Sequence, residues 1–92
     1  MIGTSYDQDK DIAVLDFDKE KRQLVLFNDD LISFDQVITC LIKYCKHSTL
    51  QAEQCAVIVH TKGKTCIKEG KQDFLNKIKI NLDNEGLTTE IQ

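Results

Sequence analysis

Residues 24–45 read LVLFNDDLISFDQVITCLIKYC and decide the fold, because a strand, a turn and a helix follow one another without interruption. Leu24–Phe27 is an apolar run typical of a buried strand, and Asn28-Asp29-Asp30 has the composition of a turn. Ser33-x-x-Gln36 has the spacing of a capping box, in which the hydroxyl accepts from the third helical N–H and the amide reaches back. Apolar residues then recur at helical spacing and line one face of a predicted helix: Phe34, Val37, Ile38, Leu41 and Cys45.

A second helix is predicted to follow at once. Ser48-x-x-Gln51 repeats the capping pattern, and we expect the helix to end at His60. Gly63 is placed to adopt the left-handed conformation that turns the chain into a strand over Lys64–Glu69. The apolar stripe of this helix is formed by Ala52, Cys55, Ala56 and Val59. His47 is expected to cap the loop between the two helices.

The segment after Gly70 fits two interpretations. Phe74, Leu75, Ile78 and Leu82 have helical spacing, while Ile78, Ile80 and Leu82 alternate as in a strand. We favour the helix, because Glu85-Gly86 supplies a stop before a last short strand, Leu87–Ile91. The predicted order is therefore β-α-α-β-α-β, an α+β fold with three helices packed on a small three-stranded antiparallel sheet.

The first 23 residues differ from the rest of the chain. They carry six acidic and four basic residues around one short apolar patch. We interpret residues 1–23 as a mobile N-terminal extension and residues 24–92 as one domain. The alternative is that residues 12–17 form a strand, joined to the next by a hairpin loop.

Composition excludes several classes of function. The 92 residues have a formal net charge of −3 and a pI near 5.2, so there is no cationic surface to hold nucleic acid. No stretch approaches the roughly 20 apolar residues of a membrane span, and Met1 is followed by polar residues rather than a signal peptide. We therefore expect a cytoplasmic protein. The four cysteines are Cys40, Cys45, Cys55 and Cys66. Because they lack C-x-x-C spacing, we expect them to be reduced and mostly buried thiols rather than a zinc site.

Two features could carry chemistry. Asn28-Asp29-Asp30 ends a strand, where a rigid element holds side chains that face outward. The alternative is a simple Asx turn. His60 lies near a helix end and is by itself consistent with an ordinary surface group. The amide, the carboxylates and a neutral imidazole of these residues are all hydrogen-bond acceptors.

The string L-V-L-F-N-D-D, a helix, and then A-x-x-V-H-x-x-G-K resembles the ClpS family, the adaptor proteins of the bacterial Clp protease. The resemblance covers Leu24–Gln92. Its most specific parts are Asn28-Asp29-Asp30 after an apolar strand, Gln51-Ala52-Glu53 opening the second helix, and Val59–Lys64 leaving it. The β-α-α-β-α-β order of the family matches the predicted one.

The resemblance implies an adaptor that recognises proteins with a large hydrophobic first residue (Leu, Phe, Tyr or Trp) and hands them to an AAA+ Clp unfoldase of the ClpA or ClpC type. No cofactor, metal or catalysis is implied. Asn28, Asp29 and His60 would bind the ammonium group, while Asp30 would shape the loop and add negative potential. The apolar pocket, which could also be ordinary core, would be lined by Ile32, Phe34, Val37, Ala56, Val59 and Leu87.

The sequence after the acidic pair differs from the common family pattern, and this difference bears on which first residues the pocket accepts. The family commonly has x-Thr-Pro-Met after the acidic pair, and this chain has Leu31-Ile32-Ser33-Phe34. A rigid Phe34 ring in place of a flexible methionine is expected to exclude β-branched first residues and to narrow the choice among Leu, Phe, Tyr and Trp.

Docking to the unfoldase is expected near Asp73 and Lys77, which could equally be solvated helix surface. The extension is expected to assist delivery.

Two other functions fit the same residues. Asp29, Asp30 and His60 could form the site of a small metal-dependent hydrolase. A generic protein-interaction domain without selectivity for chain starts is the second alternative.

Overall fold

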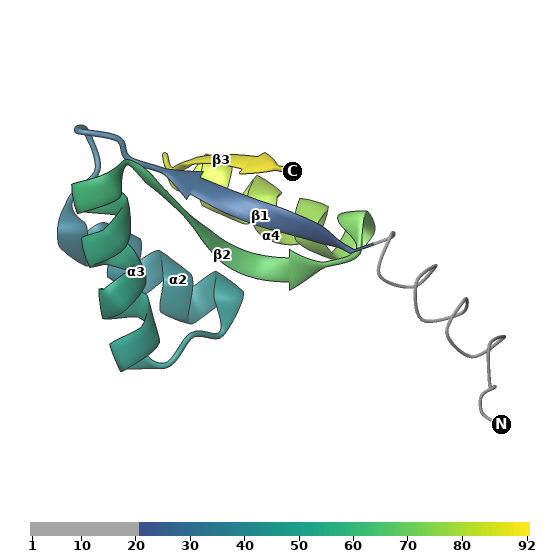
Figure 1. Cartoon of the computed structure of the whole chain (residues 1–92), viewed down its shortest axis with the longest axis horizontal. Coiled ribbons are helices and arrows are strands. Elements are labelled where there is room, and N and C mark those ends of the chain that lie inside the picture. The colour runs from purple at the N-terminus through teal and green to yellow at the C-terminus, as the bar shows by residue number, and fades with distance from the viewer. Residues whose placement is uncertain (1–20) are drawn as a thin grey trace, which may run out of the picture.

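The computed structural model describes residues 21–92, which form six elements in the predicted order (Figure 1). The first strand begins two residues earlier than predicted, so residues 22 and 23 belong to the sheet. The alternative strand over residues 12–17 lies outside the described residues. The elements are β1 (Arg22–Phe27), α2 (Phe34–Cys45), α3 (Thr49–Lys62), β2 (Lys64–Gly70), α4 (Gln72–Asn84) and β3 (Thr88–Ile91).

The sheet has β1 at its centre, with β2 and β3 paired antiparallel on either side. Phe27, the last residue of β1, pairs with Lys64 of β2 and with Thr88 of β3. The end of α3 and the turn before β3 therefore converge where β1 ends. Figure 1 shows α4 running along the sheet and the α2–α3 hairpin packed beside it.

The core lies between β1 and the three helices. Leu24 and Leu26 of β1 are no more than 1% exposed. The helices contribute the remaining largest side chains that are fully buried: Leu41, Cys45, Leu75 and Leu82. No helix within residues 21–92 has the length and hydropathy needed to span a bilayer.

Both predicted serine caps are present. The hydroxyl of Ser33 accepts from the N–H of Gln36 at 3.1 Å, and that of Ser48 accepts from the N–H of Gln51 at 3.1 Å. The second half of the first predicted capping box is absent. The Gln36 side-chain amide does not reach back to the start of its own helix but donates to the carbonyl of Glu85 at 2.8 Å. A contact across 49 residues has replaced the local one.

The turns that end α3 and α4 depend on glycine. The α3 helix extends to Lys62, two residues further than predicted, and Gly63 then adopts a φ of 93°. After α4, Gly86 has a φ of 96°, and the N–H of Leu87 donates back to the carbonyl of Leu82 at 3.1 Å. A side chain with a Cβ is strained in this left-handed region, which explains both glycines.

The four cysteines are free thiols. Burial is confirmed for two of them, Cys40 and Cys45, but Cys55 is only half-buried and Cys66 is exposed. The prediction of mostly buried thiols was therefore half wrong, because Cys66 lies in an edge strand with solvent beside it. Burial raises the pKa of the Cys45 thiol to about 11, which keeps it protonated at neutral pH.

His47 does more than cap a loop. It is only 6% exposed, and its Nε2 lies 2.7 Å from the carbonyl oxygen of Ile67 in β2. Because a carbonyl can only accept, Nε2 carries the hydrogen. The histidine thus fastens the α2–α3 loop to the sheet.

Candidate functional site

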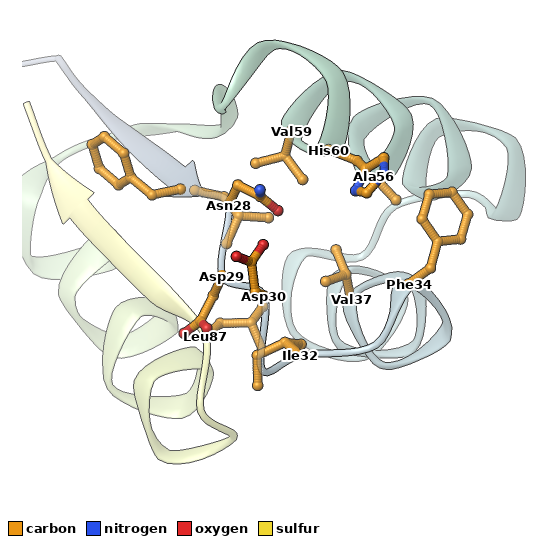
Figure 2. A pocket seen from close by; sticks show the side chains of 12 residues that line it. Asn28, Asp29, Asp30, Ile32, Phe34, Val37, Ala56, Val59, His60 and Leu87 are labelled. Atoms are coloured by element: carbon orange, nitrogen blue, oxygen red, sulfur yellow. The ribbon is translucent and has the colours of Figure 1, made fainter.

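A cavity of about 260 Å³ opens where β1 ends, between α2, α3 and the segment before β3 (Figure 2). All ten residues predicted to form the ammonium site and the apolar pocket line this cavity. Two further residues, at the end of β1, were not predicted because an apolar strand gives no sign of which side chains reach a cavity. The lining residues are Leu26, Phe27, Asn28, Asp29, Asp30, Ile32, Phe34, Val37, Ala56, Val59, His60 and Leu87.

Pairing of β1 with β2 brings Asn28 and His60 to the same cavity mouth. The backbone N–H of Asn28 donates to the carbonyl of Gly63 at 2.9 Å, so the chain leaving β1 is held against the end of α3. His60 lies in the last turn of α3, three residues before that glycine. Both side chains are exposed to solvent at the mouth.

The two aspartates that follow point in different directions (Figure 2). Asp29 forms the Asx turn that was the alternative interpretation, since its Oδ1 accepts from the N–H of Leu31 at 2.9 Å. Its Oδ2 accepts from the hydroxyl of Thr88 at 3.3 Å, which ties the loop to the start of β3.

Asp30, in contrast, is exposed, and its carboxylate points into the cavity near Asn28 (Figure 2). This carboxylate accepts no hydrogen bond from any group within residues 21–92. The carboxylate that faces the cavity is therefore that of Asp30, whereas the family resemblance implied that Asp29 would bind the ammonium group.

The inner surface of the cavity is apolar. Ala56, Val59 and Leu87 are at most 5% exposed, and Val59 is also part of the hydrophobic core. Val37 is half-buried and packs against that core, so it contributes to both the core and the cavity wall, as expected. Phe34 is 44% exposed and stands at the rim, on the first turn of α2 (Figure 2).

This arrangement has a definite chemical preference. The mouth offers an amide oxygen, a carboxylate and an imidazole nitrogen as acceptors, while the interior offers only hydrocarbon. A cationic donor group directly beside an apolar side chain would complement this arrangement.

The metal-dependent alternative lacks its ligand set. Within the described part of the chain, no three His, Cys, Asp or Glu side chains are grouped so that they could hold a metal ion. Asp29 is bound to Thr88 and Leu31 instead of facing His60. The predicted unfoldase contacts, Asp73 and Lys77, are exposed on α4 and do not line the cavity.

The chain matches a protein-family model and shares sequence with a known protein. The family model described as "ATP-dependent Clp protease adaptor protein ClpS" matches residues 18–89. Over 61 residues, the chain is 31% identical to the E3 ubiquitin-protein ligase UBR1 of Drosophila melanogaster. The match covers 66% of this chain but only 3% of that much longer protein.

A solved structure shares the fold. The structure of Agrobacterium tumefaciens ClpS2 bound to L-phenylalaninamide superposes with a TM-score of 0.69, at 20% sequence identity. The match covers 79% of this chain and 98% of that one. Because the family model spans most of the residues and the predicted β-α-α-β-α-β order is confirmed, the chain belongs to the ClpS family of Clp protease adaptor proteins.

Proposed function

We propose that this protein is an adaptor that binds proteins bearing a large hydrophobic N-terminal residue and delivers them to an AAA+ Clp unfoldase for degradation. The observation that carries the proposal is the cavity itself, which has acceptors at its mouth and hydrocarbon inside. The ligand named for the ClpS2 structure, L-phenylalaninamide, has the matching chemistry of a free amino group beside an apolar side chain. In this role the protein makes and breaks no covalent bond.

The α-ammonium group would lie at the mouth, between Asn28, Asp30 and His60. Asn28 and neutral His60 would accept hydrogen bonds, and the Asp30 carboxylate would supply the negative charge. Asp29 would act on the ligand through the loop that it holds in place, and would add to the negative potential. The resemblance of Asn28-Asp29-Asp30 and His60 to the family pattern implies the same four residues.

The expected affinity is moderate. Burying a Leu-sized side chain contributes about 1.5–3 kcal/mol, and each charge-assisted hydrogen bond contributes about 1.5–3 kcal/mol. Ordering the peptide costs at least about 4 kcal/mol, so micromolar binding, near −8 kcal/mol, lies at the favourable end. Such a complex releases its cargo readily, as delivery to a second machine requires.

Phe34 is proposed to restrict the entrance. Phe34→Ala is expected to strengthen the binding of a peptide that begins with Ile by roughly tenfold, because the ring no longer blocks branching at the β carbon. Leu-initiated binding should change less. Fluorescence anisotropy with labelled peptides that differ only in the first residue would measure both affinities.

The matched control for this change is Phe74→Ala. Phe74 is 48% exposed, against 44% for Phe34, but it lies on α4 beside Gly70 and does not line the cavity. Its removal should alter neither affinity. If Phe34→Ala fails to improve Ile-initiated binding, Phe34 does not gate the entrance.

Delivery is proposed to use a different part of the molecule. Asp73 and Lys77 on α4 are proposed unfoldase contacts, and the residues that precede β1 are proposed to act as an extension that assists delivery. A degradation assay tests the function as a whole. Reconstituted with a Clp unfoldase and peptidase, the adaptor should accelerate degradation of a fluorescent reporter that begins with Leu. The same reporter beginning Met-Leu should be unaffected, and equal acceleration of both would refute N-terminal selection.

A further inference from the structure

Glu85 connects the end of α4 to α2 through two hydrogen bonds. Its backbone carbonyl accepts from Nε2 of Gln36 at 2.8 Å, and its Oε2 accepts from the hydroxyl of Tyr44 at 2.8 Å. Gln36, Cys40 and Tyr44 are spaced by four residues, so they share one face of α2. The hydrogen bond from Tyr44 places the Glu85 carboxylate beside this face, and burial, followed by that carboxylate, raises the pKa of the Cys40 thiol.

The four residues that begin at Glu85, here called the wall segment (85–88), include Leu87, which forms part of one side of the cavity. Leu87 lines the cavity and is 5% exposed. A Cβ added to Gly86 would lie 3.1 Å from Cδ1 of Ile32, so the backbone packs directly against another lining residue. Thr88 donates to Asp29 at 3.3 Å. The wall segment is thus attached to α2 at one end and, through Asp29, to the loop after β1 at the other.

The opposite side of the cavity is carried by α2. Figure 2 shows Val37 and Phe34 across the cavity from Leu87. Because Gln36 and Tyr44 belong to the same helix as Val37 and Phe34, the bonds to Glu85 fix the separation of the two sides.

We propose that Glu85 is a positioning residue that sets the width of the cavity and so limits the size of the first residue that the protein accepts. This inference rests on the proposed function. Glu85 does not itself line the cavity. Without the Glu85 side chain, the wall segment keeps the hydrogen bond from Gln36 to its backbone and keeps Leu87 buried. The segment therefore stays in place but can move to admit a larger side chain of the ligand. Apolar pockets discriminate single methylene groups by about tenfold or more, so a small change in width alters selectivity measurably.

The test is the ratio of affinities for peptides that begin with Trp and Leu and are otherwise identical. Glu85→Ala should raise the Trp/Leu ratio by roughly fivefold or more, because only the larger ring was limited by the wall. Tyr44→Phe should reproduce the change, since it removes the same hydrogen bond. Glu85→Gln should restore the wild-type ratio, because the amide oxygen can still accept from Tyr44.

Asp83→Ala is the matched control. Asp83 is also acidic and near the end of α4, but it binds Lys79 at 2.7 Å and Thr89 at 2.8 Å and so ties α4 to β3. Its loss should lower the unfolding temperature without moving the ratio. If Glu85→Ala weakens both peptides equally, or leaves the ratio unchanged, the inference is overturned.

The proposed function is checked first, on the wild-type protein. If the wild type binds N-acetylated peptides as tightly as peptides with a free amino group, the proposed function is refuted. The positioning role of Glu85 is then refuted as well. If only free peptides bind and the ratio does not respond to Glu85→Ala, the role of Glu85 alone is refuted.

Discussion

Asp30→Asn is expected to weaken the binding of a Leu-initiated peptide by roughly 10-fold to 150-fold. The estimate corresponds to one hydrogen bond between charged groups, worth about 1.5–3 kcal/mol. The reason lies in the orientation of the side chain, which points into the cavity and accepts no hydrogen bond within residues 21–92. Asparagine has nearly the same shape, so the change removes charge and little else. Fluorescence anisotropy at fixed ionic strength is the measurement.

Two variants with the same change of charge serve as controls. Asp35→Asn alters an exposed residue in the first turn of α2 that does not line the cavity, so it should have little effect. Asp29→Asn keeps an oxygen that can accept from the N–H of Leu31. Its loss of affinity for the peptide should therefore be smaller than that of Asp30→Asn. An Asp30→Asn variant that behaves like Asp35→Asn would show that Asp30 is not the counter-ion.

Ala56→Leu is expected to reduce affinity by a similar factor through the apolar part of the site. Ala56 is 1% exposed and lines the cavity, so a leucine there would occupy the space proposed for the first side chain of the ligand. The lost burial is worth about 1.5–3 kcal/mol, or roughly 10-fold to 150-fold in affinity. Because the cavity has room for the added carbons, the unfolding temperature should change little.

Ala52→Leu is expected to lower the stability of the fold rather than the affinity for the peptide. Ala52 lies one turn earlier on α3 and is fully buried in the core without lining the cavity. An added side chain there should destabilise the fold by about 1–3 kcal/mol, because it overpacks a filled region. Unfolding in urea separates the two effects. If Ala56→Leu bound Leu-initiated peptides normally, the cavity would not be the side-chain pocket.

Much of the fold follows from local signals in the sequence. Ser33 and Ser48 cap the N-termini of α2 and α3, as predicted. Gly63 ends α3 and reverses the chain so that β2 can follow, also as predicted. These features depend on residues within one turn of each other, where spacing and residue type suffice. The ten predicted lining residues also meet at one cavity, because they come from the loop after β1, the start of α2, one face of α3 and the segment before β3.

The features that the sequence did not predict depend on contacts between distant residues. The amide of Gln36 binds Glu85 across 49 residues rather than its own helix cap. Asp29 turns toward Thr88, 59 residues away, and leaves Asp30 facing the cavity. His47 binds the carbonyl of Ile67 and is buried by a strand 20 residues later. In each case a short-range motif fits equally well, and only the packed structure determines which partner is used.

The most direct test of the central claim compares three peptides that share one sequence. The first begins with Leu and has a free amino group, the second is the same peptide acetylated at its amino terminus, and the third has Met added before Leu. We predict micromolar binding, of the order of −8 kcal/mol, for the first and at least about 100-fold weaker binding for the second, by fluorescence anisotropy. The third should also bind more weakly than the first. Equal affinity for all three would contradict the account, because the cavity would then not recognise the start of a chain.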